Sequence, residues 1–401
     1  MTFDSLWGSI LDVGRDPAGG YRRFAWTTAD LTLREWFHGE ATARGMTVEE
    51  DRNGNVWAWW LPTGWTGDPV DAFVTGSHLD SVPGGGAFDG PLGVVSAFAA
   101  IDVLKARGVA PRIPVAVVAF SDEEGGRFGV ACVGSQLSTG AVTAERALNL
   151  RDADGTTLAD ALGKAGRNPQ HVGPDPELTK RIGVYVELHV EQGRALDLVD
   201  RPVAVASSIW PHGRWRFRFC GEGNHAGTTR LVDRRDPMLA FASTVHAARE
   251  RATLHEAVAT FGKLTVTPNG ANAIPSQLDA WLDARAADED TLAAMVEAIA
   301  ADATGADDRI AVTVDAESVS PAVVFPDEPR ARIMRTLGDL PVLPTQAGHD
   351  AGVLSEKVPT AMLFVRNPTG VSHSPDEYAE IADCRTGAEA LADVMADWLL
   401  G

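Results

Sequence analysis

The sequence predicts an α/β protein of two domains, with the second domain inserted into the first. Three observations lead to this prediction. The chain has 401 residues, about two to three typical domain lengths, which implies two domains or one large domain with an insertion. Its first 200 residues alternate apolar runs of strand length with amphipathic stretches, as α/β folds do. From about residue 210 the pattern changes, and the first pattern resumes after residue 321.

Apolar and amphipathic runs predict the elements of the first domain in order. Fully apolar runs predict buried strands, and a run in which apolar and polar side chains alternate predicts one core face and one polar face. The buried strands are expected at Ala72–Ser77, Ile113–Phe120 and Ala361–Val365, the alternating strand at Val184–Val190, and helices at Gly90–Arg107 and near Arg385–Leu400.

The middle segment has the order strand, helix, strand, strand, helix, strand. These elements are expected at Trp215–Cys220, Pro237–Ala252, Gly262–Thr267, Gln277–Ala284, Glu289–Ala303 and Ile310–Asp315. The order β-α-β-β-α-β is typical of a four-stranded sheet with two helices on one face. We therefore expect a first domain formed by residues 1–210 and 325–401, and an inserted domain formed by residues 211–324.

Charge and cysteine content narrow the possible partners and location. Thirty-five basic residues against 55 acidic ones give a net charge of −20, which disfavours binding to nucleic acid or to anionic membranes. The cysteines Cys132, Cys220 and Cys384 form no CxxC pair, so neither a disulfide framework nor a thiolate zinc site is indicated. No leader-like segment and no apolar run of about 18 residues is present. We expect a soluble cytoplasmic protein.

Two clusters of polar residues follow the predicted strands, where α/β sheets place their ligand crevice. In GSHLDSVPGGGAFDG, a glycine-rich turn brings His78 near Asp80 and Asp89. In SDEEGGRFG, Glu123 and Glu124 follow a buried strand, and adjacent carboxylates at a metal can act separately as ligand and general base. Either segment alone is also compatible with a solvated acidic loop.

Two further histidines extend this set. His189 lies with Glu187 and Glu191 in YVELHVEQG, and His373 lies in a loop after another apolar strand. A single histidine in such a place is more often structural. Together, however, the clusters supply three histidines and several carboxylates without a thiolate, the ligand set expected of a hydrolytic site with one or two Zn²⁺ or Mn²⁺ ions.

From about Gly76 onward the chain resembles the di-metal aminoacylase and carboxypeptidase G superfamily of amidohydrolases. Within it, the sequence is most similar to the branch of N-carbamoyl-L-amino-acid hydrolases, β-ureidopropionases and allantoate amidohydrolases. The ordered motifs that carry the resemblance are GSHLDSVPGGGAFDGPLGV, EEGGRFG, ELHVEQG, GNHAGTTR, PNGANAIP, QAGHDAG and GVSHSP. Of these, HVEQG and NHAGTT indicate the ureido branch.

The resemblance implies a di-metal aminopeptidase-like catalytic domain with an inserted ferredoxin-like domain for dimerisation or as a lid. It implies two divalent ions, Zn²⁺ or Mn²⁺, with Co²⁺ or Ni²⁺ also compatible with the ligands. One ion would be held by His78, Asp89 and His189, and the other by Asp89, Glu124 and His373. Asp80 would orient His78 or its surroundings. Glu123 would be the general base.

The inserted domain would complete the site. By resemblance, His225 stabilises the oxyanion and often acts from the partner subunit, which implies a homodimer. Gln192, Asn272 and Arg285 would bind the substrate, Asn272 and Arg285 through its carboxylate. The chain departs from the family pattern at Arg230, Gln346 and Arg366, which leaves the substrate in doubt; an added arginine near the site would favour a diacid.

These implications converge on a hydrolase of linear, non-peptide C–N bonds. The expected substrate is a small anion, an N-carbamoyl-L-amino acid or allantoate, with release of ammonia and, for carbamoyl substrates, of CO₂. Two alternatives keep the same machinery: an N-formyl- or N-formimino-amino-acid hydrolase, and an aminoacylase or dipeptidase. A third alternative is a metal-free binding protein that retains the fold.

Overall fold

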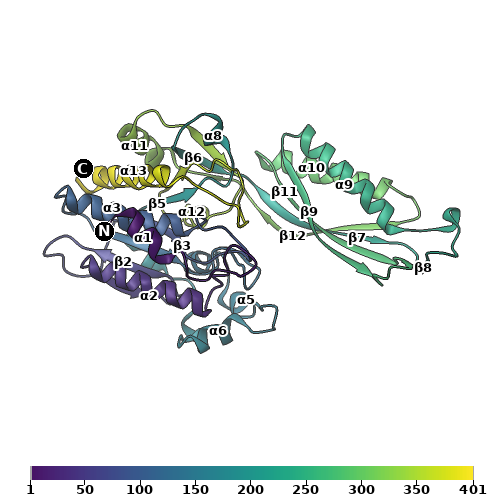
Figure 1. Ribbon diagram of the computed structural model, residues 1–401, viewed down its shortest axis with the longest axis horizontal. Helices are drawn as coiled ribbons and strands as arrows, with labels where there is room; N and C mark the ends of the chain where they lie inside the picture. Colours follow the sequence, from purple (N-terminus) through teal and green to yellow (C-terminus); the bar gives the residue numbers. More distant parts are fainter. Residues whose placement is uncertain (1, 401) are drawn as a thin grey trace. The chain divides into compact units, whose positions relative to one another are not determined.

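A computed structural model describes residues 2–400, and these divide into two compact units (Figure 1). Unit 1 contains the residues up to Ser207 and those from Phe325 onward, and unit 2 is the continuous segment Ser208–Val324. The predicted mixed α/β fold with a central sheet is confirmed. No helix of the described residues is both long enough and apolar enough to span a membrane.

Unit 1 is built on a twisted sheet whose central strands are parallel. The order is β1-β2-β4-β3-β5-β15-β6, and β14 also pairs with β6. The short strand β13, Val323–Val324, ends unit 2 and pairs with the last two residues of β6, Ser208 and Ile209. The neighbours β4, β3, β5 and β15 run parallel, whereas β1, β2 and β6 are antiparallel to their partners. The strands of this sheet in unit 1 are β1 Thr47–Glu50, β2 Val56–Trp60, β3 Ala72–His78, β4 Val115–Phe120, β5 Ile182–Val190, β6 Val203–Ile209, β14 Val342–Thr345 and β15 Thr360–Val365.

Helices pack against this sheet, and α3 is buried along most of its length, from Pro91 to Ile101. It packs against β3, β5, α1 and α13, which explains why its sequence is apolar almost throughout. The helices of unit 1 are α1 Phe3–Ile10, α2 Thr28–Ala43, α3 Pro91–Ala106, α4 Val133–Thr139, α5 Ala144–Leu148, α6 Leu158–Lys164, α7 Pro176–Arg181, α8 Ala195–Leu198, α11 Asp327–Leu337, α12 Asp350–Leu354 and α13 Ile381–Leu400, with a 3₁₀ turn η1 at Pro169–His171.

Strand β5 differs from expectation in one respect. Its polar face is buried as deeply as its apolar face, because β5 lies between β3 and β15 in the middle of the sheet. The polar groups on that face are paired within the protein: Tyr185 donates to the carbonyl of Gly76, and Glu187 accepts from the hydroxyl of Ser77 and the amide of Ala351. Alternation along a strand therefore marked a buried polar layer here.

Unit 2 has the expected order of elements and its own core. Its antiparallel sheet has the order β12-β7-β11-β9, and Figure 1 shows α9 and α10 side by side over one face. The elements are β7 His212–Cys220, α9 Pro237–Leu254, β9 Val258–Thr267, β11 Gln277–Arg285, α10 Glu289–Gly305 and β12 Ala311–Ser320; β8 Asn224–His225 and β10 Ala273–Ile274 form a separate pair, and η2 is a 3₁₀ turn at Leu231–Asp233.

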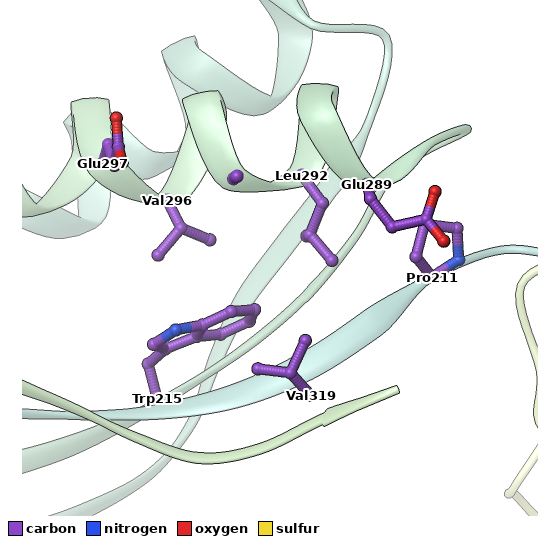
Figure 2. A pocket seen from close by; sticks show the side chains of 8 residues that line it. Pro211, Trp215, Glu289, Leu292, Val296, Glu297 and Val319 are labelled. Carbon is purple, nitrogen blue, oxygen red and sulfur yellow. The ribbon is translucent and has the colours of Figure 1, made fainter. Parts of the chain in front are cut away.

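Unit 2 also carries an apolar groove of about 280 Å³ between α10 and the strands β7 and β12. Figure 2 shows Leu292 and Val296 of α10 on one side of it, with Trp215 and Val319 on the other. The titratable residues of its lining are two glutamates. This lining offers no metal-binding histidine.

Candidate metal centre

The side chains singled out from the sequence of the first domain gather at one edge of the unit 1 sheet. His78 is the last residue of β3, His189 lies near the end of β5, and the two glutamates of the EEGG motif follow β4. Asp89 immediately precedes Gly90, which caps α3, and His373 follows β15. Because β3, β4, β5 and β15 are parallel, their carboxyl ends meet at this edge.

A first group consists of His78, Asp89 and His189, all buried, with one possible ligand atom from each lying within 4.8 Å of the others. Nε2 of His78 lies 3.5 Å, and Nε2 of His189 3.3 Å, from Oδ1 of Asp89. The opposite ring nitrogens face backbone carbonyls, with Nδ1 of His78 3.2 Å from the oxygen of Asp80 and Nδ1 of His189 2.9 Å from that of Val190. This arrangement places the proton on Nδ1 and leaves each Nε2 able to accept.

A second group consists of Asp89, Glu124 and His373. Nε2 of His373 lies 3.4 Å from Oδ2 of Asp89 and 3.4 Å from Oε2 of Glu124. Asp89 therefore offers one carboxylate oxygen to each group. The second group is the more accessible one, since the His373 side chain is about half exposed (52 %).

These residues fit divalent cations. The buried atoms Nε2 of His78, Nε2 of His189 and Oε1 of Glu124 have no hydrogen-bond partner, which is costly unless something else binds them. The separations of 3.3–3.5 Å are long for hydrogen bonds. They match the edge of about 3.4 Å expected for a tetrahedron of ligands about 2.1 Å from a cation.

The electrostatics of the cluster are dominated by buried carboxylates. Burial would raise the pKa of Asp89, but the imidazoles of His189, His373 and His78 hold this pKa well below its usual range. Burial raises the pKa of Glu124 to about 7, and the charge of Asp89 adds to the rise. A cation in this place would relieve the repulsion between the two carboxylates.

Glu123 belongs to neither group of ligands and lies beside them. Its Oε2 is 3.6 Å from Nε2 of His78, and its Oε1 accepts from the thiol of Cys132 at 3.3 Å. Burial raises the pKa of the Glu123 carboxyl well above its usual range; the repulsion of Asp350 contributes to the rise, and the charge of His78 opposes it. Glu123 is thus held next to the first group with one oxygen directed at it.

Asp80 contacts more than the imidazole that the resemblance assigned to it. Its backbone oxygen faces Nδ1 of His78, while its carboxylate lies 3.6 Å from that nitrogen. The same carboxylate accepts from the backbone amides of Glu123 at 3.2 Å and Glu124 at 3.0 Å. Asp80 therefore holds the loop that carries both glutamates.

The residues expected to bind substrate occupy different places. Nε2 of Gln192 donates to Oδ2 of Asp89 at 2.8 Å, so Gln192 lies at the cluster. In unit 2, His225 and Asn272 are exposed neighbours, and the amide after His225 donates to the carbonyl of Asn272. Arg285 ends β11 and pairs with Asp283. Strand β11 begins beside the β8–β10 pair, so Arg285 lies at the other end of the sheet from His225.

The residues that depart from the family pattern are largely engaged elsewhere. Arg366 forms ion pairs with Asp383 at 2.7 Å and Asp200 at 2.8 Å, which neutralises its charge, so the structure gives no support to a diacid preference based on it. Arg230 is exposed and pairs with Asp233 at 2.6 Å. Gln346 is half-buried before α12.

Sequence reasoning gave no role to several buried residues that adjoin the cluster. The His349 ring packs edge-on against His189 with centroids 4.5 Å apart, and the next residue, Asp350, accepts from the hydroxyl of Ser135. Both lie in the motif QAGHDAG, which was a usable signal. Glu377, in the segment SPDE, accepts from the amides of Phe88 and Asp89, a contact that no local pattern announces.

The chain is similar to known proteins along nearly its whole length. N-carbamoyl-L-amino acid amidohydrolase from Geobacillus stearothermophilus is 35 % identical over 398 residues, covering 97 % of this chain and 96 % of the relative. Allantoate amidohydrolase from Escherichia coli strain K12 is 32 % identical over 394 residues, covering 94 % and 93 %. The crystal structure of an amidase of the hydantoinase/carbamoylase family from Burkholderia vietnamiensis has a TM-score of 0.86 and 30 % identity, covering 100 % and 98 %.

A family model places the chain more broadly. Residues 74–397 match the model described as peptidase family M20/M25/M40. The matched segment includes the strands and loops that carry the cluster of ligand groups. The match covers most of the chain, and the two relatives align with this chain along nearly their whole length. The protein therefore belongs to the M20/M25/M40 peptidase family of hydrolases.

Proposed function

We propose that the protein hydrolyses a linear, non-peptide C–N bond of an N-carbamoyl-L-amino acid or of allantoate and releases ammonia, with CO₂ as a further product of carbamoyl substrates. The observation that carries this proposal is the position of Asp89, whose two carboxylate oxygens face two separate groups of histidine and carboxylate ligands. The names of the relatives supply the substrate class.

The proposed cofactors are two divalent ions. His78, Asp89 and His189 would hold one, and Asp89, Glu124 and His373 the other. The nitrogen and oxygen donors, without a thiolate, suit Zn²⁺ or Mn²⁺ best and also accept Co²⁺ or Ni²⁺. Bound there, such ions polarise a carbonyl oxygen and lower the pKa of water.

Glu123 is the proposed general base. Its Oε2 takes a proton from the attacking water and delivers it to the departing nitrogen, while Cys132 holds Oε1. A carboxyl whose pKa is raised by burial is suited to both steps, since it must accept the proton and then release it. Asp80 keeps Glu123 in place through the backbone.

We further propose a homodimer in which His225 stabilises the oxyanion from the partner subunit. The nine residues of β11 span about 26 Å, so His225 and Asn272 lie far from Arg285 within one copy of unit 2. A small substrate can meet both groups only if they come from different copies. Unit 2 also has surfaces suited to a second copy: β9 is an edge strand with Leu264 exposed, and Leu239 projects from α9, 66 % exposed.

A cytoplasmic location is proposed from the cysteines. All three are unpaired thiols, and Cys132 and Cys384 are buried, as in proteins of reducing compartments.

The function is tested on metal-stripped protein reloaded with Zn²⁺ or Mn²⁺. The panel contains N-carbamoyl-L-amino acids, their D-enantiomers as matched controls, allantoate, formyl- and formimino-glutamate, and dipeptides, with ammonia and free amino acid both measured. Ammonia release from the L-carbamoyl compounds or from allantoate is expected. If only formyl, formimino or peptide substrates are hydrolysed, the proposed substrate class is wrong and the corresponding alternative takes its place. If the protein binds neither metal and hydrolyses none of the compounds, it is a binding protein and not an enzyme.

A further inference from the structure

Glu377 contacts the backbone of Asp89, the residue whose carboxylate is shared by the two ligand groups. It is buried, with 5 % of its surface exposed, and its Oε1 accepts from the backbone amides of Phe88 at 2.9 Å and Asp89 at 3.0 Å. A single oxygen thus binds two consecutive amides from a segment almost 300 positions earlier in the chain. Those amides would otherwise be buried donors at the end of the glycine-rich turn.

The loop that carries Glu377 also carries His373. His373 has a φ of +53°, a conformation that non-glycine residues hold only where the surroundings enforce it. The amide of Glu377 closes the loop by donating to the carbonyl of Ser374. Between the two segments, Oγ of Ser372 lies 3.4 Å from both Oδ2 of Asp89 and Oε2 of Glu377.

The glycine-rich turn is shaped to admit this side chain. A Cβ added at Gly86 would collide with the side chain of Glu377, both at its Cβ and at its carboxylate. The third glycine of the run Gly84–Gly86 therefore leaves the space that Glu377 occupies. The contact therefore depends on both segments: Gly86 has no side chain that would fill this space, and the buried carboxylate of Glu377 occupies it.

We propose that Glu377 is a positioning residue that sets where Asp89 stands between the two ligand groups. The inference rests on the proposed metal centre. Asp89 contributes an oxygen to each group, so a shift of its backbone alters both groups at once. Residues that orient metal ligands in this way typically change metal affinity by about 10- to 100-fold when they are replaced.

The test compares three full-length variants. Glu377→Ala removes the acceptor, Glu377→Gln keeps a carbonyl oxygen for the same two amides, and Asp376→Ala removes an exposed acid from the same loop as a matched control. Zn²⁺ and Mn²⁺ affinities are measured by chelator competition. We expect at least a tenfold weaker affinity in Glu377→Ala, a change of less than about threefold in Glu377→Gln, and no change in Asp376→Ala.

Amide hydrogen exchange of the segment 84–90 in the metal-free proteins gives a second reading that does not depend on the metal. Exchange at Phe88 and Asp89 should be faster in Glu377→Ala than in the wild type, and near the wild-type rate in Glu377→Gln. Gly86→Ala, which keeps the acid but displaces it, should accelerate the same amides.

The outcomes separate the two proposals. Unchanged exchange and unchanged metal affinity in Glu377→Ala would overturn the positioning role, as would a loss in Glu377→Gln equal to that in Glu377→Ala. A wild-type protein that binds neither Zn²⁺ nor Mn²⁺ would overturn the proposed metal centre, while the exchange measurements would still decide whether Glu377 holds the Asp89 segment.

Discussion

At the scale of single residues, hydrogen bonds to one atom of a side chain determine which other atom of that side chain can bind a metal ion or substrate. His78 and His189 direct Nδ1 at backbone carbonyls, which reserves Nε2 for the centre. The Glu123 carboxylate is likewise divided, with one oxygen held by the Cys132 thiol and the other directed at the ligand group. Burial and the charge of Glu123 keep the pKa of the Cys132 thiol well above its ordinary value, so this thiol remains a donor.

Replacing the proposed base tests this division of roles. Glu123→Gln should lower kcat by about 100- to 10 000-fold, because an amide cannot take the proton from water. The amide oxygen can still accept from Cys132, and Glu123 is in neither ligand group, so metal content should stay at the wild-type level. Steady-state kinetics and elemental analysis of the same preparation are the measurements. A kcat within tenfold of the wild type would show that another group is the base.

At the scale of elements, α3 packs closely on the sheet. Gly93 lies on the face of the helix that meets β5, and an added Cβ would collide with the carbonyl oxygen of Leu188 and lie 2.7 Å from Cβ of Ser77. Asp89 and Gly90 lie just before α3, so the depth at which the helix docks also sets the position of Asp89 relative to β3.

A pair of glycine substitutions measures this packing. Gly93→Ala should destabilise unit 1 by about 1–3 kcal/mol, since the backbone of β5 cannot move aside. Gly39→Ala in α2 is the control: nothing lies within 4 Å of its Cβ position, so the change should be neutral or stabilise by about 0.5–1 kcal/mol. Urea unfolding of both variants is the measurement, and equal effects of the two substitutions would contradict the packing argument.

At the scale of the whole molecule, the two units have separate cores. The cluster of buried side chains in unit 1 and that in unit 2 share no residue, and the ligand groups lie in unit 1. Cations bound at those groups should stabilise unit 1 and leave the intrinsic stability of unit 2 unaltered.

If the two units unfold in separate transitions, removing the metal should lower the unfolding temperature of unit 1 only, and returning the metal should restore it. At 100 times the dissociation constant of its site, each bound Zn²⁺ should stabilise unit 1 by about 2.7 kcal/mol, and a chelator should reverse the shift. Calorimetry of the metal-free and reloaded protein, with the isolated segment 208–324 as a reference for unit 2, is the measurement. A metal-induced shift in that isolated segment would place the site elsewhere.

The proposed dimer is testable by mixing two inactive variants. His225→Ala and Glu123→Gln, co-expressed in equal amounts, should regain about a quarter of wild-type activity, since half of the dimers are mixed and each mixed dimer has one intact site. Each variant alone should be nearly inactive. If His225 acted within its own chain, co-expression would restore nothing; a monomer in sedimentation would also rule out the arrangement.

The sequence by itself determined the α/β class, the order of the main elements in unit 2, four strands and two helices of unit 1, and the polar residues at the strand ends. Strands and helices follow from local periodicity, and parallel strands bring their carboxyl ends to one edge, so residues such as His78, Glu124 and His189 could be named in advance. Asp89 and His373 could be named in the same way, in loops near the strand ends, and the resemblance added which residues would act as ligands. Their roles as ligands stay a prediction.

Only the tertiary structure showed which segments, far apart in the sequence, the polar side chains near the metal centre contact. Asp80 holds the amides of the two-glutamate loop, Glu377 holds the Asp89 segment, and Arg366 is neutralised by Asp383 and Asp200. The buried polar face of β5 belongs here as well. Each of these contacts joins segments that only packing brings together, and a buried acid finds its partner by satisfying whichever amides the fold leaves beside it. No local pattern in the sequence encodes that choice.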